Sequence, residues 1–425
     1  MANHRTRSLP NQLVRVAEVS AQIPMPMLKV LVDTRQMFFD LCVRTGRQTL
    51  QALMEADRDA VCGPKGRHDT ARVATRGGST PSWVTLGGRQ IPIARLRARC
   101  EQGELVLPTF LWAADRDPLD THTLEAIAAG VSTRKYRRSL ETLAADVPQR
   151  STSRSSVSRR FVALTKQRLA EFLSRPIERE VRIVMIDGKV FEEHCLLVAL
   201  GIRADGIKRV LGLWEGTTEN ASVARSLLRD LVGRGLVTDR PVLFVIDGSK
   251  ALRKAIAQTF GRLAVVQRCQ QHKKVNVREH LPQTMRPGLE RALEDAWKSE
   301  RADLAQRQLE RLASSLDRDH PGAAASLREG LEETLTLQRL GATGALYRTL
   351  RTTNPIENLN GSLENYTRNV KRWRGGSMIQ RWGCAALIEA EQKFRRIRGH
   401  RDLARLIAAL DALHPAEPTH HSKVA

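Results

Sequence analysis

The stretch from residue 181 to 274 constrains the fold more than any other part of the chain. It contains five short apolar runs, in order "VRIVMI", "HCLLVALGI", "KRVLGLWEG", "PVLFVI" and "LAVVQRC". Amphipathic segments with helical spacing follow the third and fourth runs. Asp205-Gly206 between the second and third runs is a hairpin signal. Three antiparallel strands followed by alternating helix and strand predict a mixed sheet with helices on both faces.

This order of elements is the topology of the RNase H-like fold, so we expect an α/β catalytic core of that type. A chain of 425 residues is too long for one ordinary domain. Changes in periodicity divide it into the following expected segments: an N-terminal helical region (1–60), a small β-rich module (61–117), a helix-turn-helix region (118–176), the first part of the core (177–275), a helical insertion (276–346), the second part of the core with a glutamate-bearing helix (347–400), and a C-terminal helix and tail (401–425).

The charge of the chain indicates a polyanionic partner. The formal net charge is +23 and the isoelectric point is about 10.6, which favours double-stranded DNA. No apolar run is long enough to span a bilayer, and the N-terminal residues lack the apolar core of a signal peptide. The six cysteines form no C-x-x-C pair, which argues against a disulfide framework or a four-cysteine zinc site. We therefore expect a cytoplasmic, bacterial nucleoid-associated protein without membrane contact.

Two basic segments in the region 118–176 have the pattern of a helix-turn-helix motif. Each has a polar residue that can cap a helix, followed by an arginine-rich first turn. An ordinary helical hairpin would give the same pattern. The candidate DNA-binding residues are Ser132, Arg134, Lys135, Arg137 and Arg138 in the first segment and Arg154, Arg159 and Arg160 in the second.

Two aspartates stand where apolar runs end, and they are candidates for metal binding. Asp187 follows the first run and Asp247 follows the fourth. If these two strands are neighbours, both carboxylates lie at one edge of the sheet. Hard oxygen ligands favour Mg²⁺ or Mn²⁺, and two such ions can catalyse phosphoryl transfer. The competing interpretation is a pair of simple Asp-Gly turns, which is stronger for Asp187 than for Asp247.

Several strings resemble the catalytic region of Mutator-type bacterial insertion-sequence transposases, a group of DDE recombinases. They are "MIDGKV", "VLGLWEGTTENA", "FVIDGSKALRKAI", "VVQRCQQHKKVNV", "RTTNPIENLN" and "NVKRWRGGSMIQRW". The resemblance implies Asp187, Asp247 and Glu357 as the three catalytic, metal-binding acids. It also implies cleavage at transposon inverted-repeat ends and strand transfer of the 3′-hydroxyl into target DNA. We expect a homo-oligomer, a dimer, in the DNA complex.

Glu357 also has a structural interpretation. Asn354 suits a helix N-cap, Pro355 suits the first helical position, and a glutamate three residues after the cap completes a capping box. A metal ligand must instead point towards the two aspartates, so we expect Glu357 to face the ends of the strands. Glu215 is the reserve ligand if one of the three acids is misassigned.

Other residues could position the substrate. Cys269 and His272 have a C-x-x-H spacing that recurs in the family, and the alternative is a plain strand-end pair. Lys371, Arg372 and Arg374 are candidates for phosphate contacts, with Trp373 between them as a possible stacking residue.

Two other functions fit parts of this pattern. Tyr366 among its basic neighbours could serve a covalent recombinase, which needs no metal. A basic helix-turn-helix regulator would bind DNA without catalysis. The presence of all three acids argues against the second alternative.

Overall fold

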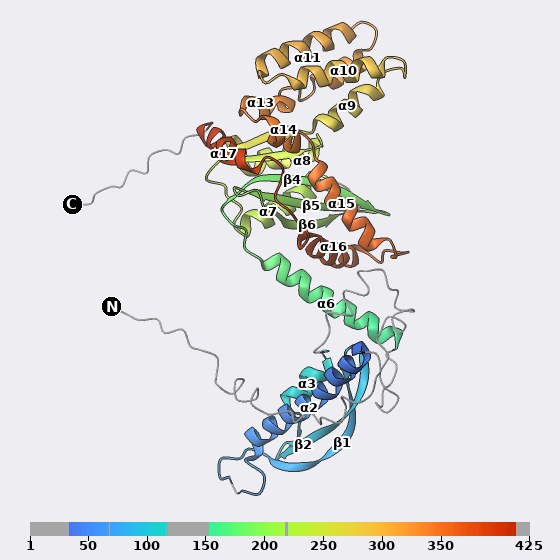
Figure 1. Cartoon of the computed structure of the whole chain (residues 1–425), viewed down its shortest axis with the longest axis vertical. Helices are drawn as coiled ribbons and strands as arrows, with labels where there is room; N and C mark the ends of the chain where they lie inside the picture. The colour runs from blue at the N-terminus through green and yellow to red at the C-terminus, as the bar shows by residue number, and fades with distance from the viewer. Residues whose placement is uncertain (1–33, 68, 116, 118–152, 217–219, 414–425) are drawn as a thin grey trace, which may run out of the picture. The chain divides into compact units, whose positions relative to one another are not determined.

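The computed structural model describes residues 34–67, 69–115, 117, 153–216 and 220–413, coloured in Figure 1. The chain divides into two compact units, Met1–Leu164 and Thr165–Ala425. Most of the predicted helix-turn-helix region, including the candidates at 132–138, lies outside the described residues. The second basic segment forms helix α6 (Arg154–Ser174). No helix in the described ranges is long and apolar enough to cross a membrane.

The first unit packs a long helix against a β-hairpin. Its elements are α2 (Thr34–Cys62), β1 (Thr75–Leu86), β2 (Arg89–Cys100), β3 (Gly103–Leu105) and α3 (Pro108–Asp115). The glycine-rich stretch that precedes residue 80 is partly strand, because β1 begins at Thr75. The register shifts between Arg76 and Ser79, so the two glycines there form a bulge. A bulged strand and a loop are hard to distinguish from composition, because both favour glycine.

The second unit contains the sheet that the sequence predicts. Its strands are β4 (Val181–Phe191), β5 (His194–Arg203), β6 (Lys208–Gly216), β7 (Val242–Ile246) and β8 (Ala264–Arg268). The spatial order is β6-β5-β4-β7-β8. Strand β5 is antiparallel to both β4 and β6, whereas β7 runs parallel to both β4 and β8. The mixed sheet confirms the α/β class.

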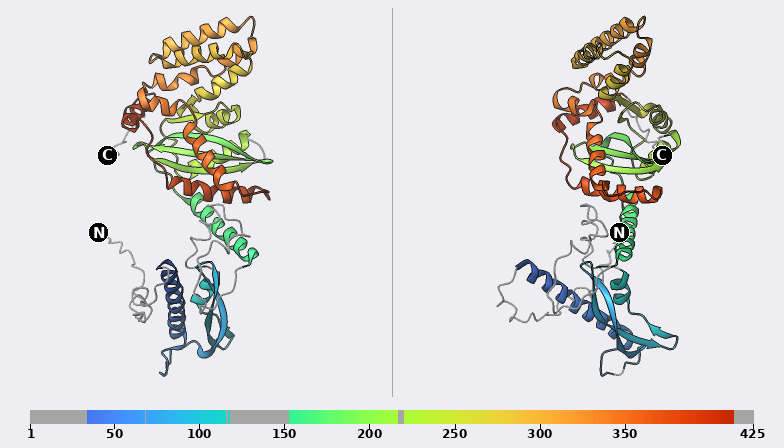
Figure 2. Two further views of the ribbon diagram at one scale, coloured as in Figure 1. Left: turned by 45° about the vertical axis from the view of Figure 1, so that its right-hand side comes forward. Right: turned by 90° about the vertical axis from the view of Figure 1, so that its right-hand side faces the viewer.

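Helices cover both faces of this sheet, as predicted (Figure 2). Helices α7 (Ala221–Gly233) and α8 (Lys250–Phe260) pack on the face that carries Val184 and Phe244. The opposite face, which carries Met185 and Val245, packs against helices from the C-terminal part of the chain. These are α15 (Asn354–Thr367), α16 (Gly376–Glu391) and α17 (Leu403–Ala412). Residues alternate between the two apolar cores along each strand, because successive side chains point to opposite faces.

Between β8 and α15 the chain is helical, as expected, and forms the yellow and orange helices of Figure 1. The main helices are α9 (Gln270–Glu279), α10 (Arg286–Lys298), α11 (Ala302–Leu316), α12 (Pro321–Arg328), α13 (Thr336–Arg339) and α14 (Gly344–Leu350). They bury a core of their own that includes Leu293, Trp297 and Leu309. Helix α14 leads into the turn before α15, so the insertion returns directly to the sheet.

Candidate active site

Asp187 lies inside a strand rather than at its end. The apolar run was expected to stop before Asp187, but β4 continues to Phe191 because β5 pairs with its whole length. Asp187 pairs with Val198 and Gly188 with Leu197, so the interpretation of this Asp-Gly pair as a turn is wrong. On its other side, β4 pairs with β7 only as far as Met185. Asp187 therefore lies where the edge of β4 that faces β7 becomes free.

Asp247 occupies the matching position directly after the last residue of β7. Met185 lies opposite Val245 in the parallel register. Asp187 comes two residues after Met185, and Asp247 comes two residues after Val245. One Oδ of Asp247 accepts a 2.9 Å hydrogen bond from the backbone N–H of Ser249, which caps α8. Burial, together with the negative charge of Asp247, raises the pKa of Asp187 to about 6. The sheet thus brings the two carboxylates close enough to repel each other.

Glu357 is held by a threonine and does not form the expected capping box. Helix α15 begins at Asn354, so the N-cap is Thr353 and Pro355 is the second helical residue. Glu357 is then one residue too late for a capping box, and its backbone N–H donates to the Thr353 carbonyl at 3.0 Å. The Thr353 hydroxyl donates to Oε1 of Glu357 at 2.5 Å. The Asn354 cap was a wrong prediction, because the cap depends on local backbone geometry that composition leaves open.

Asn360 is a site residue that the sequence reasoning missed. Its side-chain amide donates to the Asp187 carboxylate at 2.7 Å and lowers the pKa of that group, against the effect of burial. Asn360 lies three positions after Glu357, and residues at this spacing share one face of a helix. Helix α15 therefore presents Glu357 and Asn360 from the same face. The motif "NPIENLN" offered a signal, since a buried asparagine on this face needs a partner.

Cys269 and His272 lie beside Glu357. Within the described ranges, Cys269, His272 and Glu357 form the group of three possible metal-binding side chains whose ligand atoms all lie within 4.8 Å of one another. The Cys269 thiol is fully buried, accepts a hydrogen bond from the backbone N–H of Thr353 at 3.4 Å, and lies 3.3 Å from the Thr353 hydroxyl oxygen. Burial alone would raise the pKa of this thiol, but hydrogen bonds from His272 and Thr353 lower it.

The charge of His272 links the three acids. A hydrogen bond with Cys269 raises the pKa of His272 to about 9, and the carboxylates of Glu357 and Asp247 add to the shift. The His272 imidazolium in turn lowers the pKa of Asp187. The Nδ1 atom of His272 lies 3.8 Å from Oε1 of Glu357. The positively charged side chain beside the acids is therefore the His272 imidazolium. The carboxylate oxygens of the acids, and the repulsion between their negative charges, suit divalent metal ions.

Comparison with known proteins identifies the family. The model of "Transposase, Mutator family" matches residues 29–396. The chain belongs to the Mutator family of transposases. A relative of this Mutator-family chain, the transposase for insertion sequence element IS1081 of Mycobacterium tuberculosis, is 26% identical over 89% of the chain and 94% of its own length. The transposase for IS6120 of Mycolicibacterium smegmatis is 33% identical, but the match covers 42% of the chain and about half, 54%, of that relative.

The basic residues predicted to contact phosphates lie in the turn between α15 and α16. Lys371, Arg372 and Arg374 are exposed, and the described residues provide none of them with a hydrogen-bonding or ion-pairing partner. Trp373 between them packs edge-on against Phe191, with ring centroids 4.9 Å apart. Part of the indole is thus already in contact with the protein.

The remaining candidates have other partners. The reserve ligand Glu215 lies on β6, where its carboxylate contacts Nδ1 of His194 at 2.5 Å. The Tyr366 hydroxyl accepts a hydrogen bond from Lys393 at 3.1 Å. Tyr366 is nine residues beyond Glu357 on α15, which is about 14 Å along a helix. On α6, Arg154 and Arg159 are exposed, whereas Arg160 donates to Thr85 and lies 3.6 Å from Asp117.

Proposed function

We propose that this chain is a DDE transposase with an RNase H-like catalytic core. In this proposal it cleaves DNA at the inverted-repeat ends of an insertion sequence and transfers the 3′-hydroxyl into target DNA. The observation that carries the proposal is the position of Asp187 on β4 and of Asp247 directly after the neighbouring parallel strand β7, beside the helix that carries Glu357. Ligands of α/β sheets bind beyond the carboxyl ends of such strands.

Asp187, Asp247 and Glu357 would hold two Mg²⁺ or Mn²⁺ ions. Bound there, these ions would lower the pKa of an attacking water or 3′-hydroxyl and stabilise the leaving oxygen. Asn360 keeps Asp187 oriented through its 2.7 Å hydrogen bond. Thr353 and His272 both contact Glu357. Because both contacts go to the same oxygen, Oε1, the second carboxylate oxygen of Glu357 is left for another ligand.

Double-stranded DNA is the proposed partner. The exposed cations at Lys371, Arg372 and Arg374 follow the C-terminal end of the helix that carries Glu357 and would hold phosphates of DNA that extends beyond the acids. Arg154 and Arg159 on α6 would add contacts from outside the core. A dimer would bring two such sites to the two ends of one element.

Strand cleavage of an end-sequence duplex in Mg²⁺ tests the proposal. Asp187→Asn and Glu357→Gln should each lower the cleavage rate by about 10³-fold or more, because each removes a ligand charge from the transition state. Glu364→Gln on the same helix is the matched control and should cleave at the wild-type rate, since Glu364 pairs with Lys189 at the surface. Retained cleavage in both acid variants would overturn the DDE assignment. So would a covalent protein–DNA product in the wild type together with a loss of cleavage in Tyr366→Phe.

A further inference from the structure

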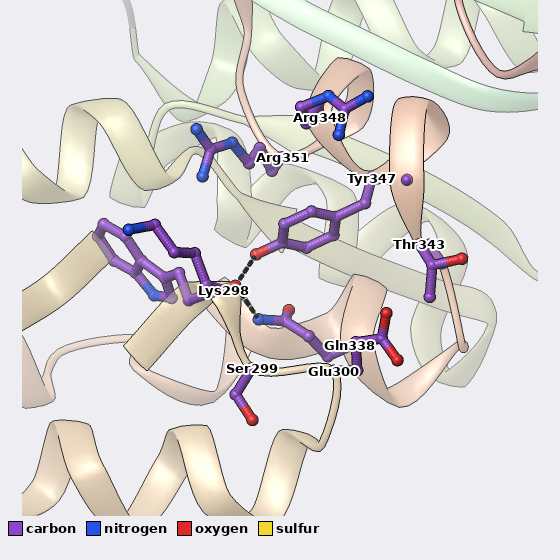
Figure 3. Close-up of a pocket in the computed structure, with 11 residues that line it drawn as sticks. Lys298, Ser299, Glu300, Gln338, Thr343, Tyr347, Arg348 and Arg351 are labelled. Carbon is purple, nitrogen blue, oxygen red and sulfur yellow. Dashed lines mark hydrogen bonds between the residues drawn. The ribbon is translucent and has the colours of Figure 1, made fainter. Parts of the chain in front are cut away.

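A cavity of about 290 Å³ lies where the helical insertion returns to the catalytic core. Its lining comes from the end of α10, from α13 and from α14, and it includes Lys298, Gln338, Tyr347, Arg348 and Arg351 (Figure 3). Small-molecule sites are commonly on the order of 300 Å³ or larger. The cavity is therefore the size of one base with part of its sugar, and too small for a paired duplex.

A residue in the lining of this cavity, Gln338, has a hydrogen-bond acceptor without a donor. Gln338 is 6% exposed, and its amide nitrogen donates to the Trp297 carbonyl at 3.3 Å. The Tyr347 hydroxyl donates to the same carbonyl at 2.8 Å, so both groups converge on one oxygen in Figure 3. This bond fixes the amide orientation, and Oε1 of Gln338 is left buried without a hydrogen-bond partner in the described structure. Such an atom favours a ligand that donates a hydrogen bond.

The outer wall is basic. Arg348 and Lys298 are exposed, and Arg351 lies over the Tyr347 ring at 5.9 Å from its centroid. Lys298 already pairs with Asp295, and Glu300 is the acid in the lining. Among the described residues, no hydrogen-bond or ion-pair partner reaches the Arg348 guanidinium. Two arginines beside an aromatic ring are suited to a phosphate next to a stacked base.

We propose that this cavity binds one unpaired nucleotide, with the base amino group donating to Oε1 of Gln338 and the phosphate at Arg348 and Arg351. Adenine and cytosine present a terminal amino group, whereas the N3–H of thymine is flanked by two carbonyl oxygens that would repel Oε1. The pocket therefore favours adenine or cytosine over thymine. The nucleotide comes either from a base that leaves the DNA duplex or from a free mononucleotide.

The position of the cavity connects it to the candidate active site. The Arg351 carbonyl accepts a 2.9 Å hydrogen bond from the N–H of Gln270, the residue after Cys269. The side chain of Gln270 also bonds the Tyr347 hydroxyl. Arg351 is two residues before Thr353, which holds Glu357. A nucleotide in the cavity would thus contact the segment that positions the catalytic helix, although the inference needs no cleavage chemistry and goes beyond the proposed function.

Binding of the full chain to fluorescent DNA in EDTA tests this inference. One probe is a duplex with a single bulged 2-aminopurine, and the other is the same duplex with 2-aminopurine paired to thymine. The wild type should bind the bulged duplex about tenfold more tightly. Gln338→Met and Arg348→Ala should each abolish that preference. Arg311→Ala, an exposed insertion arginine outside the lining, should keep it.

Competition by free nucleotides identifies the source of the ligand. If dAMP displaces the bulged duplex at micromolar concentration and dTMP does not, a mononucleotide is the ligand; if neither competes, the ligand is an extrahelical base. Equal affinity for both duplexes without competition by dAMP would overturn the inference, as would a preference that survives in both variants. Arg348 is exposed, so its variant keeps the test valid even if Gln338→Met unfolds. Asp187→Asn should keep the preference, which separates this outcome from a failure of the catalytic proposal.

Discussion

At the scale of single residues, Asn360 is the side chain whose role can be tested most directly. Asn360→Leu keeps the branching at Cγ but removes the donor to Asp187. That hydrogen bond lowers the pKa of Asp187, so its loss should raise this pKa above its present value of about 6. If cleavage needs the ionised carboxylate, the acidic limb of the pH–rate profile should move to higher pH by about 0.5–1 unit.

The matched control for this experiment is Asn358→Leu, because Asn358 is exposed on the same helix. Its pH–rate profile should coincide with that of the wild type. A variant at position 360 that lowers the rate equally at every pH would contradict the role assigned here. It would mean that Asn360 supports the fold of the site without tuning Asp187.

At the scale of elements, a buried lysine joins α9 to the end of α12. Lys273 is fully buried, and its ammonium donates to the backbone carbonyls of Ser326 and Glu329. Burial, together with the charge of Arg268, lowers the pKa of Lys273 from 10.5 to about 8. Between these pH values the unfolded chain binds more protons than the folded one, so this group makes stability rise with pH.

Lys273→Met should remove this contribution. Urea unfolding at pH 7.5 and pH 10 should show the wild type gaining ~2–3 kcal/mol relative to the variant over that range. Lys254→Met replaces an exposed lysine on α8. Its free energy of unfolding should change with pH in the same way as that of the wild type. A difference between Lys273→Met and wild type that stays constant with pH would show that the ammonium keeps an ordinary pKa in the folded chain.

The elements also show what the sequence could predict. Apolar runs determine the strands and their order, because burial on both faces leaves a continuous hydrophobic signal. The extension of β4 through Asp187 was not predictable, since it depends on pairing with β5, which lies further along the chain. The same holds for Asn360 and Thr353, whose partners come from distant segments. The aspartates could be found because they follow apolar runs, whereas their supporting residues required the tertiary structure.

At the scale of the whole molecule, the net charge of +23 belongs to the entire chain, and exposed cations occur on both faces of the core sheet, so charge alone does not locate the DNA. Lys371, Arg372 and Arg374 lie in the turn between α15 and α16, on the face of the sheet that these helices cover. Arg229, Lys254 and Arg262 are equally exposed, but they belong to α7, α8 and the turn after α8, which cover the opposite face. These two sets of three cations therefore carry the same charge at different places.

Replacing each set with glutamine separates specific phosphate contacts from general attraction. Each phosphate contact contributes about 0.9 to the slope of log Kobs against log salt concentration for duplex DNA, so the triple variant at 371, 372 and 374 should reduce the slope by about 2.7. The triple variant at 229, 254 and 262 should leave the slope nearly unchanged, because distant charges are screened. Fluorescence anisotropy from 50 to 300 mM KCl measures both slopes. Equal reductions in the two variants would mean that DNA does not select the face that carries Glu357, and the phosphate role of the turn after α15 would be lost.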